Sequence, residues 1–82
     1  MLEIGKLYVV KAVFYTWLFK KSSGLSITTF SRCLCLDDNE RWEDGGRICD
    51  DSQIEWIKPA SRNYVSIWNR MFDDNIKMDC YD

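Results

Sequence analysis

The sequence contains no histidine, and only one proline and four glycines interrupt its 82 residues. The absence of histidine removes the commonest general base, the usual activator of a nucleophile and the commonest metal ligand. Phosphate-binding loops, dinucleotide-binding fingerprints and the Gly-x-Ser-x-Gly motif are also missing. The chain thus lacks the residues of an ordinary enzyme, and we expect a non-catalytic protein without a cofactor.

Long apolar runs are scarce as well. Residues 7–19 are apolar except for Lys11 and Thr16, but this segment is too short to cross a bilayer as a helix. Glu3 interrupts the positive region that a secretion signal needs, and no cleavage site of small residues follows. These features predict a cytoplasmic protein with no membrane segment.

Aromatic residues, in contrast, are plentiful: four Trp, four Tyr and four Phe. A chain of this length forms one domain, residues 1–82, and buries only about 60% of the surface that its unfolded form exposes. Each buried aromatic side chain removes roughly 150–250 Å² from water, which helps so small a domain to build a core.

The pattern of residues predicts mainly strands in the first three quarters of the chain. Residues 5–19 are rich in β-branched and aromatic residues and indicate one long strand. Both of its alternating faces are apolar, so we expect it to be covered on both sides or to bend through a bulge. Further extended segments and turns follow, and we expect strands at 26–36, 41–42, 47–49 and 53–58, with turns at 37–40 and 43–46.

The C-terminal quarter predicts a helix. Ser61 is a suitable N-cap for a helix over residues 62–73. Apolar residues follow it at helical spacing, at Tyr64, Ile67, Trp68, Met71 and Phe72. Residues 76–81 then alternate and indicate a closing strand.

Together these elements predict a β-rich α+β fold. It is either a small SH3-like barrel or a curled antiparallel sheet of about four or five strands, with one C-terminal helix. We expect one core that contains the following residues: Val9, Val13, Ile54, Trp56, Ile67, Trp68 and Phe72.

Charge is distributed unevenly along the chain. Residues 1–36 carry five bases and one acid, whereas residues 37–82 carry six bases and twelve acids. This polarity favours encounter with a charged partner. Trp42 lies among acids near predicted turns, so we expect it to anchor a partner inside a negative rim. The predicted partner-binding residues are Trp42, Asp37, Asp38, Glu40, Glu43 and Asp44.

A second interpretation is a small β-barrel that binds nucleic acid. Basic residues are interleaved with an aromatic residue in the first half of the chain, at Lys11, Tyr15, Lys20, Lys21 and Arg32. A pI near 5.0 counts against nonspecific binding to a phosphate backbone. Nucleic acid is therefore the alternative partner.

Two further kinds of site would use acid doublets or cysteines. Paired carboxylates could catalyse hydrolysis, and four thiolates could bind zinc. Three of the four acid doublets fall in predicted turns, where Asp is common, and neighbours in a strand point to opposite faces. Four cysteines, Cys33, Cys35, Cys49 and Cys80, lack the spacing of a zinc knuckle. We expect all four to be reduced and free of metal.

In general character, the chain resembles the small accessory proteins that tailed bacteriophages encode to modify or block host machinery. The resemblance is carried by the short chain, the opening Ile4-Gly5-Lys6-Leu7-Tyr8-Val9-Val10 and the mixture of Trp with acid doublets. It implies a monomeric or dimeric inhibitor that occludes the surface of a larger host protein, with a basic groove as the expected contact. It carries over no functional residue.

Overall fold

The computed structural model describes residues 2–82, which form one antiparallel sheet, one α-helix and one short 3-10 helix. Its strands are β1 (Leu7–Ala12), β2 (Thr16–Lys21), β3 (Phe30–Leu36), β4 (Trp42–Gly45) and β5 (Ile54–Pro59). A short 3-10 helix, η1 (Asp51–Gln53), precedes β5, and the helix α1 (Arg62–Phe72) follows it. The order of strands in the sheet is β4-β3-β2-β1-β5.

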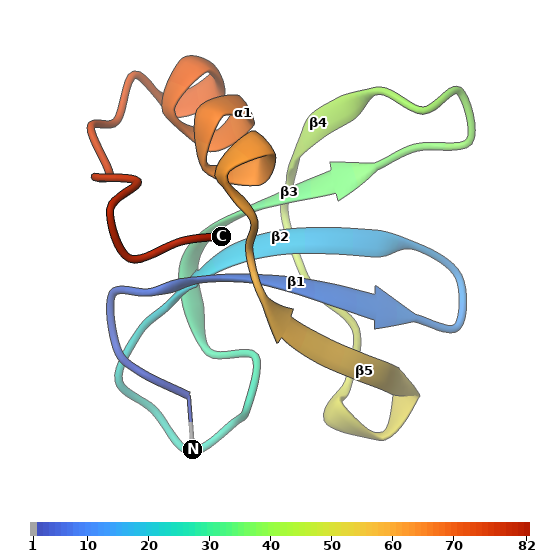
Figure 1. Ribbon diagram of the computed structural model, residues 1–82. Helices are drawn as coiled ribbons and strands as arrows, with labels where there is room; N and C mark the ends of the chain where they lie inside the picture. The colour runs from blue at the N-terminus through green and yellow to red at the C-terminus, as the bar shows by residue number, and fades with distance from the viewer. Residues whose placement is uncertain (1) are drawn as a thin grey trace.

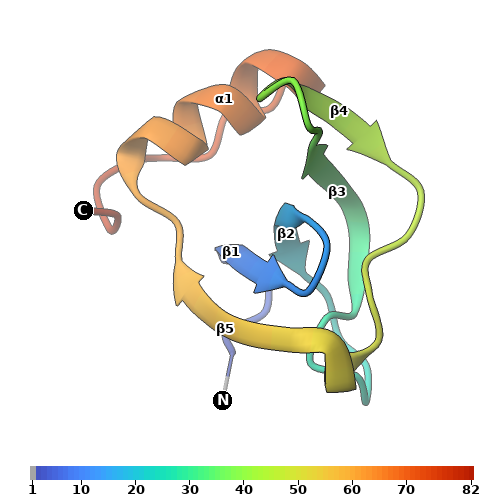
Figure 2. The ribbon, with the colours of Figure 1, turned by 90° about the vertical axis from the view of Figure 1, so that its right-hand side faces the viewer.

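The sheet is strongly curled, and its two edge strands, β4 and β5, do not pair with each other (Figures 1 and 2). Of the two predicted architectures, the curled antiparallel sheet with a C-terminal helix is the one observed. The helix α1 lies across one face of the sheet (Figure 2). Eleven residues long, α1 falls well short of a membrane span, and no other helix in residues 2–82 has the length and apolar character to cross one.

The predicted long strand over residues 5–19 is wrong in one respect, because the chain turns back at Val13 and Phe14. The Ala12 N–H donates to the Tyr15 carbonyl across 3.0 Å, and β1 and β2 form a hairpin. As expected, the strand is covered on both of its apolar faces, because four successive residues of β1, Leu7 to Val10, are buried. Leu7 and Val9 pack under α1, while Tyr8 and Val10 pack on the opposite side of the sheet.

There are therefore two clusters of buried residues, one on each face, and the predicted single core is wrong. The first, beneath α1, contains Val9 and Trp68, with Ile67 and Phe72 packed against it. The second is formed around Val10 and Phe19 and is extended by the segment between β4 and η1, which brings in Ile48. Ile54 belongs to this second cluster, whereas Val13 and Trp56 are exposed. A sheet with apolar side chains on both faces must be covered on each face. Here α1 covers one face, and the segment between β4 and η1 covers part of the other.

The predicted helix over residues 62–73 is confirmed to within one residue at its C-terminal end. Trp68 is buried as expected, but Met71 is exposed and Val65 takes its place in the core. Ser61 is the N-cap, although its side chain makes no capping bond. The Arg62 N–H instead donates to Asp82 at the C-terminus of the chain, across 2.7 Å.

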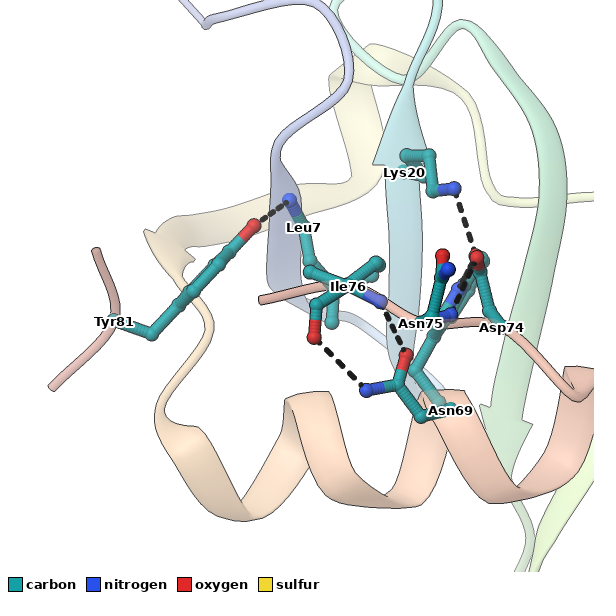
Figure 3. Close-up of polar contacts among 8 residues, drawn as sticks. Leu7, Lys20, Asn69, Asp74, Asn75, Ile76 and Tyr81 are labelled. Atoms are coloured by element: carbon teal, nitrogen blue, oxygen red, sulfur yellow. Dashed lines mark hydrogen bonds and ion pairs between the residues drawn. The ribbon is translucent and has the colours of Figure 1, made fainter. Parts of the chain in front are cut away.

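Residues 73–82 do not form the expected closing strand. They run back along α1 from its end to its beginning, as Figure 1 shows in red. Two hydrogen bonds of 3.0 Å join the Asn69 side chain to the backbone of Ile76, and the Leu7 N–H donates to the Tyr81 hydroxyl across 3.0 Å (Figure 3). The Asn69 side chain of α1 and the Leu7 N–H of β1 thus hold this segment, which pairs with no strand of the sheet.

The middle of the chain also differs in detail from the predicted pattern. The strand expected at residues 26–36 begins only at Phe30, and the turn expected at 43–46 is occupied by β4. The turn at 37–40 is present. Gly45 of β4 lies against Trp17, whose ring is 2.9 Å from the place that a Cβ atom would occupy, so this close approach requires glycine.

Candidate protein-binding surface

Trp42 does not project from a turn as an anchor. It is the first residue of β4 and is half-buried against the cluster beneath α1. Its ring meets that of Tyr64 edge to face, with 5.8 Å between centroids and 85° between planes. The structure therefore gives Trp42 a packing contact between the edge of the sheet and the helix.

The acidic turn, residues 37–40, is held by the Asp37 side chain. Its Oδ1 accepts hydrogen bonds from the N–H groups of Asn39 at 2.9 Å and Arg41 at 2.8 Å. These bonds, led by the one from Arg41, lower the pKa of Asp37. Asp38 and Glu40 are exposed, and neither forms an ion pair within residues 2–82. Asp37 thus shapes the turn, and the other two acids provide its negative surface.

The remaining two predicted binding residues lie on the edge strand β4. Glu43 pairs with Cys35 and Asp44 with Leu34 across the β3–β4 ladder. Successive side chains of a strand point to opposite faces, so these two acids do not share a surface with each other. The six predicted residues are therefore divided among a turn, a packing contact and two faces of a strand.

A surface that the sequence analysis did not recognise lies at the turn between β1 and β2. We call Val13, Phe14 and Tyr15 the hairpin tip. These three residues are 57%, 75% and 41% exposed, and Trp56 of the neighbouring strand β5 is 40% exposed. The Tyr15 ring stands edge-on to Trp17, at 6.2 Å between centroids. Large apolar side chains gathered at an exposed turn are typical of a binding surface.

The register of the strands brings the hairpin tip and the acidic turn to the same end of the sheet. Thr16, next to the tip, pairs with Leu36, next to the acidic turn. On the other side, Lys11 pairs with Trp56. The turns therefore lie on the right of Figure 1, and Figure 2 shows this end facing the viewer, with the hairpin tip between the acidic turn and the start of β5.

The basic-aromatic set predicted for nucleic acid does not form one free face. Lys20 is engaged with Asp74, its Nζ donating to Oδ2 across 2.8 Å. Lys21 is buried and bonds to two backbone carbonyls of the β2–β3 loop. The Arg32 guanidinium lies 4.9 Å from the centroid of Phe72. Lys11 and Tyr15 lie at the end of the sheet with the hairpin tip, whereas Lys20, Lys21 and Arg32 lie towards the other end of the β2–β3 ladder.

The four cysteines lie in different environments. Cys33 is buried, its Sγ donates to the Gly45 carbonyl across 3.1 Å, and burial raises its pKa to about 12. Burial also raises the pKa values of Cys35 and Cys49, which are both half-buried, while Cys80 is exposed. Within residues 2–82 no group of three or more Cys, Asp or Glu side chains is arranged to hold a metal ion.

One carboxylate does contact hydroxyl groups. Asp51 Oδ1 accepts hydrogen bonds from Ser26 at 2.9 Å and Thr28 at 3.2 Å, and its Oδ2 accepts one from the Ile27 N–H at 3.2 Å. These bonds, led by that of Ser26, lower the pKa of Asp51. A carboxylate with a lowered pKa is a weak base, so this arrangement fixes the β2–β3 loop against η1 and is poorly suited to activating Ser26.

The end of the sheet that carries the hairpin tip therefore combines exposed apolar side chains with two acids, Asp38 and Glu40, that form no ion pair among the described residues. Comparison of the chain with protein-family models, with curated proteins and with solved structures finds no significant match.

Proposed function

We propose that this chain is a small non-catalytic binding domain that acts by covering part of a larger protein's surface. The observation that carries the proposal is the hairpin tip, where Phe14 is 75% exposed to water. Neither Val13 nor Phe14 has a positive φ. The backbone conformation of the turn therefore does not explain why large apolar residues occupy it. Aromatic side chains exposed in this way supply much of the energy in protein interfaces.

The acidic turn defines the chemistry of the partner. Asp38 and Glu40 lie at the same end of the sheet as Phe14, and Glu55 of β5 is also exposed there. An apolar pocket bordered by Lys or Arg residues would receive Phe14 and face these acids. The proposed interface therefore keeps the expected aromatic anchor inside a negative rim. The anchor is Phe14 and not Trp42.

The resemblance to bacteriophage accessory proteins makes a host protein our proposed partner, and inhibition or modulation by occlusion our proposed mode of action. Such a domain needs no catalytic group, because a bound partner loses access to its own ligands. A nucleic-acid-binding role is less well supported, since Lys20 and Lys21 are engaged within the fold.

The experiment compares proteins captured from a bacterial lysate by the unchanged chain and by Phe14→Ala. Leu25→Ala is the matched control, because Leu25 is fully exposed at the opposite end of the sheet. A protein bound by the unchanged chain and the control, but not by Phe14→Ala, is then purified for calorimetry. We expect Phe14→Ala to weaken its binding by about 2 kcal/mol or more, as at interface hot spots.

Two further variants test the acids and the original anchor. Asp38→Lys with Glu40→Lys should slow association and reduce its dependence on salt. Trp42→Ala should lower the stability of the fold, because that ring packs on Tyr64. The proposal fails if Phe14→Ala captures the same proteins with the same affinity, or if the only ligands captured are nucleic acids.

A further inference from the structure

A second feature lies at the opposite end of the sheet from the hairpin tip. A cavity of about 500 Å³ opens between the N-terminal segment and the β2–β3 loop. Its wall is largely apolar and includes Leu2, Ile4, Leu25 and Ile27, of which the last three are exposed. Pockets of this size and character commonly hold small organic ligands.

The charged residue of the cavity wall is Lys21, beside two serines, Ser23 and Ser26. The residue is only 8% exposed, and its Nζ donates to the carbonyls of Ser22 at 2.6 Å and Ser26 at 3.3 Å. Lys21 and Ser26 both line the cavity, and the ammonium group is bonded to the Ser26 carbonyl. No carboxylate of residues 2–82 forms an ion pair with Lys21.

This environment leaves the charge of Lys21 uncompensated. An ammonium group has three N–H donors, and the two carbonyls use two of them. Carbonyl oxygens carry no net charge, and burying a charge without a counterion costs free energy. An anionic oxygen in the cavity would accept the third N–H and neutralise the charge.

The loop that forms the wall is already held in place. Asp51 accepts hydrogen bonds from Ser26, Ile27 and Thr28, and so ties this loop to η1. A wall fixed before the ligand arrives saves the ordering cost of binding. The exposed side chains of Leu25 and Ile27 would leave water when a hydrocarbon chain occupies the cavity.

We infer that this cavity binds a small anionic amphiphile, a carboxylate at the end of a linear hydrocarbon chain. The carboxylate bonds to Lys21, and the hydrocarbon lies against Leu2, Ile4, Leu25 and Ile27. The site is independent of the proposed protein-binding function, because it occupies the other end of the sheet.

The test titrates the full chain with decanoate, below the concentration at which it forms micelles, and follows the backbone amides by NMR. We expect shifts at residues 2–4 and 23–27. Decanol has the same hydrocarbon chain without the charge, and we expect it to bind at least about tenfold more weakly, as for the loss of a charge-assisted hydrogen bond. Equal affinity for the two probes, shifts centred on the hairpin tip, or no binding of decanoate would each overturn the inference.

Variants separate the two parts of the site. Lys21→Met keeps an unbranched side chain and should abolish the preference for decanoate over decanol. Because this variant removes bonds that hold the loop, Leu25→Asp provides a second test at a fully exposed position. We expect Leu25→Asp to weaken decanoate binding at least about tenfold, because a charged side chain replaces an apolar one that contacts the hydrocarbon. Met71→Asp, at an exposed position of α1, is the matched control, and an equal effect of these two substitutions would contradict the assignment.

Discussion

The Trp68 indole N–H donates a hydrogen bond to Asp74 Oδ2 across 3.0 Å, and so joins the buried side of α1 to the segment that follows it. The same oxygen accepts a hydrogen bond from Lys20 Nζ of β2 at 2.8 Å (Figure 3). Helix, sheet and C-terminal segment thus meet at one carboxylate. This contact accounts for an acid close to the end of a helix, where the helix dipole alone disfavours negative charge.

The first prediction concerns the ionisation of Asp74. Hydrogen bonds from Lys20 and Trp68 lower its pKa from 3.8 to about 2. A lowered pKa stabilises the fold above pH 3.8, and this stabilisation is lost as the pH falls towards 2. Asp74→Asn should reduce the free energy of unfolding at pH 7 by about 1 kcal/mol, because partial exposure screens the ion pair.

Urea denaturation at several pH values measures this effect. The difference between the original chain and Asp74→Asn should shrink below pH 3.8 and disappear near pH 2. A constant difference across this range would show that the loss comes from packing or from the Trp68 hydrogen bond and not from the charge.

The second prediction compares two tryptophans. Trp68 is 1% exposed and Trp56 is 40% exposed. Trp68→Ala should lower the free energy of unfolding by about 3–5 kcal/mol through the cavity that it leaves. Trp56→Ala should cost less than about 1 kcal/mol. Denaturation of both variants provides the measurement, and similar losses would be inconsistent with the observed placement of the two rings.

The third prediction concerns backbone strain in the acidic turn. Glu40 has a φ of 60°, in the left-handed region that favours glycine. Glu40→Gly should therefore stabilise the fold by up to about 1 kcal/mol, since relief of the Cβ strain outweighs the entropy of an added glycine. Asp38 has no positive φ, so Asp38→Gly is the control and should destabilise. Thermal unfolding distinguishes the two, and a loss of stability in both variants would argue against strain at Glu40.

The fourth prediction ranks the cysteines by reactivity. Cys80 is exposed, whereas Cys33 is buried and its pKa is raised to about 12. Since the thiolate is the reactive form, iodoacetamide should modify Cys80 first and Cys33 last in the folded chain. Mass spectrometry of digested samples gives the order, and urea should make all four sites react. Equal rates in the folded chain would contradict the burial of Cys33.

An intact mass under native conditions tests the accompanying expectation that all four thiols are reduced and free of metal. Bound zinc, or a mass lowered by the loss of hydrogens, would overturn that expectation. Either result would also contradict the different environments of Cys33, which is buried, and Cys80, which is exposed.

Local sequence patterns were sufficient for some elements. A helix over residues 62–73 is predicted because its apolar residues repeat at helical spacing and Ser61 precedes them, and the observed helix covers residues 62–72. The β1–β2 turn was missed because Val13 and Phe14 are not turn-forming residues and both flanking strands are apolar. Strands are commonly about 5–6 residues long, and the segment at 5–19 is much longer than that. Its length is the one feature of the sequence that indicates a turn within it.

The position of each functional candidate depended on contacts between distant residues. The sequence by itself determined a β-rich chain with a C-terminal helix, apolar faces on both sides of its first strands and an acidic turn at 37–40, because these follow from residue spacing and turn chemistry. The tertiary structure decided that Trp42 packs on Tyr64, that Phe14 stands exposed at the same end as the acidic turn, and that Lys21 is buried beside a cavity. Strand register and the side on which α1 lies set these three outcomes, and both depend on pairings between segments far apart along the chain.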